Sequence, residues 1–277
     1  MKKNDLGDFI MKFTLNQDYH IHTKLSSCSA DPKQTPERIL QYAKQNGFTE
    51  VCITDHFWDE TVPGASPWYQ PQNFAHISKS LPLPQSKDCR MYFGCETDMD
   101  KHFTLGISRE TMDKLDFIIV PTTHMHMTGV TVSKEDSTIS GLTRLYVERI
   151  HALLNMDLPF YKMGWAHPTC PLLANHTFED HITVIQNISD DAFKEIFSSI
   201  AKKGMGVELN MPVFEYSEEQ FEKILRPYRI AKQCGCKFYF GSDAHHPDSL
   251  DAAKAGFEKI AAELELEETD RFAPFRK

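Results

Sequence analysis

The sequence predicts an α/β protein, with about seven strands in a parallel sheet or barrel and helices outside it. Short apolar runs alternate with amphipathic helical patterns along the chain, and no low-complexity tract or interdomain linker interrupts them. Such alternation is typical of a parallel sheet covered by helices. The 277 residues suit one large domain or two modest ones, and single α/β barrels run to about 250 residues.

The predicted strands are short apolar segments, most of which end in a histidine or a carboxylate. They are residues 18–23, 50–56, 91–96, 116–124, 162–168, 204–210 and 236–245. In the first of them, DYHIHT, alternate side chains project to the same side, so His20 and His22 point together while Ile21 faces away. Two neutral imidazoles aimed at one point form a natural metal chelate. A surface strand with two exposed histidines is the alternative.

Helical patterns separate most of these strands, at residues 35–47, 140–156, 189–204, 217–235 and 248–265. In the first, Thr35 can cap the helix, Pro36 suits its first turn and Gly47 can end it. Pro227 is expected to kink or divide the fourth helix. The Pro-rich residues 58–72 predict a long loop after the second strand, and long loops inside compact domains are often functional.

Composition argues against some classes of protein. The formal net charge is -9, whereas proteins that bind nucleic acid or anionic membranes through a diffuse surface are usually basic. No stretch approaches the ~20 apolar residues of a membrane helix, and the N-terminus lacks the apolar run of a signal peptide. An odd number of cysteines, seven, predicts reduced thiols. We therefore expect a cytoplasmic protein without a membrane partner. Nucleic acid is only a weak candidate for its binding partner.

Side chains that could ligate a metal recur at almost every predicted strand end. They are His20 and His22, Asp55 and His56, Glu96, His124, His167, Glu208 with Asn210, and Asp243 with His245. In a parallel α/β barrel the C-terminal ends of all strands meet on one face, where active sites lie. Taken singly, each residue is more simply a satisfied polar group or a helix cap. Their recurrence at nearly every strand end favours one shared metal site.

The chain resembles the PHP family of metallohydrolases, named for polymerases and histidinol phosphatases. The matching segments DYHIHT, ITDH, GCE, TTH, AHP and GSDAH follow the family's order between Asp18 and His245. The resemblance implies a distorted TIM-like (β/α)7 barrel with the metal site at the C-terminal ends of the strands. Residues 1–14 would then form an N-terminal extension and residues 15–277 the barrel domain. DYHIHT and FGSDAHHPDSL are most similar to the histidinol-phosphate phosphatase branch.

Carried over residue by residue, the resemblance implies two or three divalent metal ions, with zinc, manganese and iron as candidates. The first ion would be bound by His20, His22, Glu96 and Asp243. Glu96 would bridge to a second ion, which His124 and His167 would also bind.

A third ion would be bound by His56 and His245. Relatives usually have a further histidine or acid six residues after the second histidine of the first motif. This chain has Cys28 at that position, and a thiolate favours zinc over manganese. Asp31 is an alternative ligand, and Asp55 is expected to orient a ligand rather than to bind metal.

The implied activity is metal-dependent hydrolysis of a small phosphate monoester, with L-histidinol phosphate as the leading substrate. Divalent metals lower the pKa of bound water and clamp phosphate oxygens. Glu96, Asp243 and His245 are the predicted catalytic residues. The proton for the leaving alkoxide could come from Asp243, His245 or a metal-bound water.

Residues that would bind the substrate are harder to predict. Arg144, His126 and His246 are the candidates, because arginine favours phosphate and the two histidines adjoin predicted ligands. Arg149, on the same predicted helix as Arg144, is expected to be a solvated charge. The long loop could supply an apolar lid from three aromatic residues: Trp58, Trp68 and Tyr69.

Two other functions stay open, a PHP-type phosphodiesterase or nuclease and a noncatalytic metal-binding regulator. The net charge argues against the first and the nearly complete ligand set against the second. Related phosphatases tend to have basic residues after the sixth strand, whereas VELNMPVFEYSEEQ is acidic and the next lysine is Lys223. The reaction class is therefore better supported than the named substrate. A homo-oligomer is compatible with each function.

Overall fold

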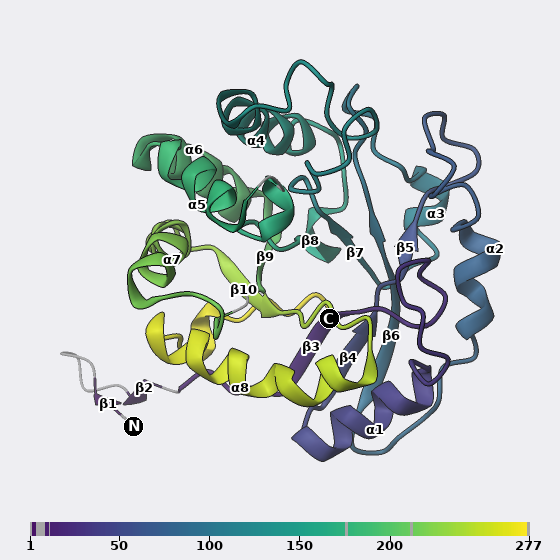
Figure 1. Ribbon diagram of the computed structural model, residues 1–277. Coiled ribbons are helices and arrows are strands. Elements are labelled where there is room, and N and C mark those ends of the chain that lie inside the picture. The colour runs from purple at the N-terminus through teal and green to yellow at the C-terminus, as the bar shows by residue number, and fades with distance from the viewer. Residues whose placement is uncertain (1, 4–8, 11, 175–176, 211–212, 276–277) are drawn as a thin grey trace.

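The computed structural model describes residues 2–3, 9–10, 12–174, 177–210 and 213–275. Its centre is an eight-stranded sheet that curls into a nearly closed barrel (Figure 1). Seven strands follow one another in hydrogen-bonded order: β10 (Lys237–Phe240), β9 (Gly206–Leu209), β8 (Met163–Trp165), β7 (Phe117–Val120), β6 (Arg90–Thr97), β4 (Glu50–Ile53) and β3 (Gln17–Ile21). All of these pairings are parallel, which confirms the predicted distorted TIM-like barrel.

Two further pairings lie outside that order. The short strand β5 (His56–Phe57) pairs in parallel with β6 and sets His56 opposite Glu96. A separate antiparallel pair, β1 (Lys2–Lys3) and β2 (Phe9–Ile10), lies away from the barrel (Figure 1). The division of the chain at residue 14 stays a prediction.

The barrel closes between β3 and β10 through a single bridge instead of a full ladder. Ile21 bridges Ala244 in parallel, and the backbone amide of His22 donates to the Ala244 carbonyl at 3.2 Å. The backbone amide of Asp243 donates to the His20 carbonyl at 2.8 Å. Closure therefore joins the first and the last segments that carry predicted metal ligands.

Helices cover the outside of the barrel (Figure 1). They are α1 (Pro36–Asn46), α2 (Phe74–Ile77), α3 (Arg109–Met112), α4 (Ile139–Leu154), α5 (Phe178–Asn187), α6 (Asp190–Lys203), α7 (Glu218–Gln233) and α8 (Pro247–Glu263). The predicted signals bound α1: the Thr35 side chain accepts a hydrogen bond from the Arg38 amide, and Gly47 ends the helix with φ of 71°.

Two helices differ from the prediction. The α5 helix was not predicted, although Thr177 and Asp180 form a capping box at its start. The α7 helix runs unbroken through Pro227, so of the two predicted effects, a kink or a division, the division is wrong. Burial explains this result, because Phe221, Ile224 and Tyr228 of α7 are buried in the core and offset the hydrogen bond that proline removes.

Aromatic side chains fill the barrel interior beneath the strand ends. Tyr19 of β3 stacks on Tyr239 of β10 and meets Phe117 of β7 edge-on, so the contacts cross the barrel. Phe272 and Phe275, after the last helix, join this cluster and close it. Phe275 stacks on Tyr92 of β6, with the two ring centroids 3.4 Å apart. Buried aromatic pairs of this kind add about 0.5–1.5 kcal/mol each beyond their area.

No helix in the described part of the chain is both long enough and apolar enough to cross a membrane. All seven cysteines lie in described segments and are free of disulfides.

Candidate metal centre

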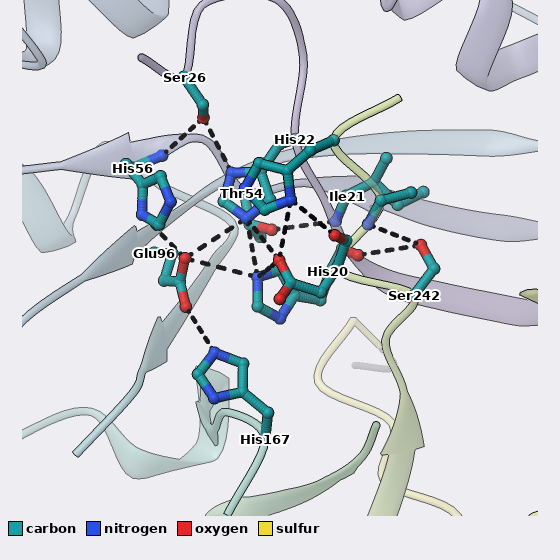
Figure 2. A network of polar contacts seen from close by, with 12 residues as sticks. His20, Ile21, His22, Ser26, Thr54, His56, Glu96, His167 and Ser242 are labelled. Atoms are coloured by element: carbon teal, nitrogen blue, oxygen red, sulfur yellow. Dashed lines mark hydrogen bonds and ion pairs between the residues drawn. The ribbon is translucent and has the colours of Figure 1, made fainter. Parts of the chain in front are cut away.

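The structure gathers eight of the nine predicted metal ligands at the C-terminal ends of the strands. Figure 2 labels His20, His22, His56, Glu96 and His167 among them. The eight residues fall into three groups, in each of which the ligand atoms lie within 4.8 Å of one another. The groups are His20, His22, Glu96 and Asp243; Glu96, His124 and His167; and His22, His56 and His245. The ninth residue, Cys28, lies outside all three groups.

Hydrogen bonds orient the first two histidines. His20 Nδ1 lies 2.8 Å from Glu208 Oε1, and a carboxylate oxygen only accepts, so Nδ1 carries the hydrogen. His22 Nδ1 lies 2.8 Å from Ser26 Oγ, whose own hydrogen goes to Asp55 Oδ1 at 2.7 Å. His22 therefore also carries its hydrogen on Nδ1. The two Nε2 atoms face each other at 3.0 Å, both with free lone pairs, as two ligands of one cation would.

The Asp55 carboxylate stabilises this arrangement through hydrogen bonds. Its carboxylate accepts hydrogen bonds from the Thr23 amide and hydroxyl, both at 2.7 Å, as well as from Ser26. Ser26 Oγ in turn accepts from the backbone amide of His56 at 3.1 Å (Figure 2). Asp55 thus fixes the loop that orients two histidines, in agreement with its predicted role.

Glu96 lies between the groups and presents one oxygen to each side (Figure 2). Its Oε2 is 3.4 Å from His22 Nε2 and 2.9 Å from His56 Nδ1. Its Oε1 is 3.0 Å from His167 Nε2 and 3.9 Å from His124 Nε2. A carboxylate placed in this way could bridge two cations.

Two further carboxylates support the second group: Asp98, which the sequence analysis missed, and Glu208, which it named as a potential ligand at a strand end. Asp98 Oδ2 lies 2.8 Å from His124 Nδ1 and accepts the Tyr69 hydroxyl at 2.5 Å. Glu208 accepts the backbone amide of His167 at 2.5 Å, in addition to its bond with His20. Asp98 follows Glu96 by two positions, so strand alternation could have placed both on the same side of β6.

Two of the predicted ligands have unusual backbone conformations. Asp243 has φ of 53° and His167 has φ of 26°, in the left-handed region that residues other than glycine rarely adopt. Such strain typically occurs at functional sites, where the surrounding structure enforces it. The Asp18 carboxylate contributes to this constraint, because it accepts the backbone amide of Ser242 at 3.0 Å.

The electrostatics of the cluster fit a divalent metal. Burial raises the pKa of Glu96, but the charges of His20 and His56 outweigh it and hold this pKa well below its ordinary value. The pKa of Asp243 is lowered by His20 in the same way, against burial. Three buried atoms at the centre, His56 Nδ1, Glu96 Oε2 and Asp243 Oδ1, form no well-aligned hydrogen bond, although they lie within 3.0 Å of other ligand atoms. A bound cation would satisfy these atoms and balance the two carboxylates.

The third group differs from the predicted set. His22 joins His56 and His245 there, and the Cys28 thiol lies outside the group although it lines the same cavity. Burial raises the pKa of Cys28 to about 12. Asp31, the predicted alternative ligand, is engaged elsewhere, with its Oδ2 3.0 Å from His246 Nε2.

A cavity of about 440 Å³ opens onto the cluster. Its lining residues are Cys28, His56, Trp68, Tyr69, His124, His126, Met127, Leu172, Asp243 and His245. Trp68 and Tyr69 of the long loop therefore reach the site, and so does His126. Burial and the nearby His124 lower the pKa of His126 to about 4, so its imidazole is neutral at physiological pH. Trp58 is a core residue instead, buried with its Nε1 donating to the Val62 carbonyl at 2.9 Å.

Two predicted substrate-binding residues lie elsewhere. Arg144 is on the exposed side of α4, where its guanidinium bonds Asp136 and Glu148, each at 2.5 Å. His246 caps α8 by accepting a hydrogen bond from the Asp248 amide. Neither lines the cavity, because local carboxylate or backbone partners hold both side chains.

The expectation that Arg149 is a solvated charge is wrong, because its side chain is fully buried. Its guanidinium donates to four backbone carbonyls, those of Met99, Asp100, Thr122 and Thr131, at 2.6–3.1 Å. Met99 and Asp100 follow β6, the strand that carries Glu96. Thr122 and Thr131 lie after β7, in the segment that also contains His124.

Comparison with known proteins identifies relatives of this chain. A probable phosphatase from Caldicellulosiruptor saccharolyticus is 24% identical over 234 residues, covering 83% of this chain and 80% of that protein. Another probable phosphatase, from Caldicellulosiruptor bescii, is 20% identical over 254 residues, covering 91% and 88%.

Among solved structures, a histidinol phosphate phosphatase from Lactococcus lactis, in complex with zinc, L-histidinol and phosphate, has the same fold. Its TM-score is 0.56 at 19% identity, covering 88% of this chain and 93% of that protein. A family model, the PHP domain, matches residues 18–212, which hold six of the eight clustered residues. The chain therefore belongs to the PHP domain family, and its relatives include phosphatases.

Proposed function

We propose that this protein is a metal-dependent phosphatase that hydrolyses a small phosphate monoester. The observation that carries the proposal is the set of three overlapping ligand groups, which share Glu96 and His22 and open onto a cavity of about 440 Å³. Family membership and the names of the matched relatives support phosphate ester chemistry.

In this proposal the ligands take the following roles. The first cation is held by His20, His22, Glu96 and Asp243, and Glu96 bridges to a second held with His124 and His167. A third is held by His56 and His245, with His22 nearest to them and Cys28 reaching the ion if its loop adjusts. Zinc, manganese and iron are the candidate metals, and nitrogen and oxygen ligands suit all three.

The bound ions would supply an activated water and positive charge for the phosphate oxygens. The chain's own residues would orient the ligands and could transfer the proton. Asp98 and Glu208 hold the histidines so that their free nitrogens point at the cluster. Asp243 and His245 line the cavity beside it. The pKa values of both are lowered, so the activated water is a third candidate, besides these two residues, to supply the proton for the leaving oxygen. No lysine or arginine is among the lining residues, so the metals would carry most of the charge on phosphate.

L-Histidinol phosphate is the first substrate to test. The Lactococcus lactis phosphatase of similar fold, solved with L-histidinol and phosphate, supports this choice. A phosphodiesterase or nuclease role is less well supported, because the chain has a net charge of -9 and the described residues that line the cavity include no lysine or arginine. A noncatalytic regulator would not need the cavity that adjoins the ligands.

The test is steady-state kinetics with Mn²⁺ or Zn²⁺ on L-histidinol phosphate, an aryl phosphate, a phosphodiester and single-stranded DNA. We expect metal-dependent hydrolysis of the monoesters, with the highest kcat/KM for L-histidinol phosphate, and loss of activity in Asp243→Ala. A preference for the diester or DNA would overturn the monoesterase proposal. Equal and slow hydrolysis of both monoesters would keep the reaction and reject the named substrate.

A further inference from the structure

The part of the cavity that lies beyond the metal groups is built from three loops. Trp68 comes from the loop after β5, His126 and Met127 from the loop after β7, and Leu172 from the segment after β8. Trp68 has 38% of its surface exposed, and Met127 and Leu172 are partly buried. These side chains form a wall of the cavity beside the cluster, with Trp68 next to His56 and His126 next to His124. The organic part of a substrate would lie against this wall while its phosphate meets the metals.

This wall offers few hydrogen-bonding groups. The Tyr69 hydroxyl also reaches the cavity lining but is already bonded to Asp98 at 2.5 Å. Cys28 contributes a thiol, which bonds weakly. The remaining polar atoms are ring nitrogens of Trp68 and His126, and His126 Nδ1 is buried without a hydrogen-bond partner.

The chemistry of the wall discriminates between two classes of organic group. An indole face beside Met and Leu side chains packs well against a flat ring. A sugar or polyol carries several hydroxyls, and each one that enters this wall gives up water without gaining a partner. Among the described residues that form the wall, none has a carboxylate, amide or hydroxyl side chain that is free to bond such hydroxyls.

We infer that this site selects phosphate monoesters of ring-bearing alcohols, aromatic or heteroaromatic, over those of sugars and polyols, and that Trp68 sets the preference. The inference rests on the proposed phosphatase function and narrows its substrate class. Trp68 is positioned for this role, because its ring centroid is 5.0 Å from that of His56, which belongs to the third ligand group. A ring stacked on Trp68 would therefore lie one side-chain width from the cluster.

The experiment compares three primary alkyl phosphates whose leaving alcohols are chemically similar: benzyl, ethyl and glycerol 1-phosphate. With the metal-loaded protein, we expect kcat/KM for benzyl phosphate to exceed that for glycerol 1-phosphate by about 10-fold or more. In Trp68→Ala, the benzyl-to-ethyl ratio of kcat/KM should fall about 10-fold, and Trp68→Phe should restore most of it. The control variant is Tyr161→Ala, an aromatic residue with 66% exposure that does not line the cavity, and it should leave this ratio unchanged.

The possible outcomes distinguish failure of this inference from failure of the proposed phosphatase function. If neither the three esters nor L-histidinol phosphate is hydrolysed with Zn²⁺ or Mn²⁺, the proposed function fails. If L-histidinol phosphate alone is hydrolysed, the phosphatase proposal stands and the inference is overturned. If all three are hydrolysed with similar kcat/KM, or glycerol 1-phosphate is preferred, the phosphatase proposal stands and the inference is overturned. A benzyl-to-ethyl ratio that Trp68→Ala leaves unchanged would likewise remove Trp68 as the specificity residue.

Discussion

Each of four histidines, His20, His22, His124 and His167, has one ring nitrogen held by a protein group and the other turned to the cluster. The holding groups are two carboxylates and two hydroxyls. Metal-binding histidines almost always have such outer partners, which fix the tautomer and the ring orientation. Glu96 differs from the histidines because both of its oxygens face ligand groups.

This difference predicts unequal effects of two substitutions. Glu96→Ala removes a ligand from two proposed metal positions, whereas His124→Ala removes a ligand from one. We therefore expect Glu96→Ala to lose more bound metal per protein, measured by elemental analysis of purified protein. His102→Ala, which removes an exposed histidine outside the three groups, is the control and should keep the full content. Equal losses from the first two variants would contradict the bridging role.

At the scale of elements, α4 connects the helical layer to the site. Arg149 reaches inward from this helix and bonds the backbone of three segments that follow β6 and β7. A buried guanidinium is costly to desolvate, and its burial lowers the pKa of Arg149 from its usual value. The four hydrogen bonds that the guanidinium donates to backbone carbonyls offset this cost. They thereby fix the segment after β6 and the segment after β7 to α4.

We expect Arg149→Met to lower the free energy of unfolding by on the order of 3 kcal/mol or more, because buried carbonyls would lose their donor. The matched control lies on the same helix. Arg144→Met removes only exposed ion pairs, so its effect should stay within about 1 kcal/mol. Urea denaturation of the three proteins measures both effects. Similar small losses in the two variants would show that Arg149 does not hold these segments.

The contrast between the two arginines shows what the sequence could predict. The convergence of His20, Glu96 and Asp243 followed from period-two alternation and from recurrence at strand ends, and these residues do lie close together. Their division among separate ions was implied only by the resemblance to the PHP family. The burial of Arg149 could not follow, because the carbonyls that satisfy it are backbone atoms of distant segments. The unbroken α7 could not be predicted for the same reason. The packing that supports Pro227 comes from the assembled core, and local helix propensity does not predict that packing.

At the scale of the whole molecule, the ligand groups take residues from strands and loops along nearly the full chain. His20 and Asp243 are joined only where the barrel closes, through the bridge between Ile21 and Ala244. An ion bound by both therefore connects the two edges of the sheet. The opposite part of the interior is held by aromatic packing around Phe272, which does not depend on a metal.

Metal removal should therefore destabilise the whole barrel. A ligand that binds only the folded state at 100 times its Kd adds about 2.7 kcal/mol, and for a protein of this size 1 kcal/mol shifts Tm by about 2–4 °C. Dialysis against a chelator should thus lower Tm by on the order of 5–10 °C, and adding Zn²⁺ or Mn²⁺ should restore it, as measured by calorimetry.

His20→Ala should remove most of this metal-dependent shift. Phe272→Ala, at the opposite part of the interior, should lower Tm with and without metal while keeping the shift, because it leaves a cavity but no missing ligand. The same Tm for the chelated and metal-loaded native protein would show that no metal bridges the two edges of the barrel.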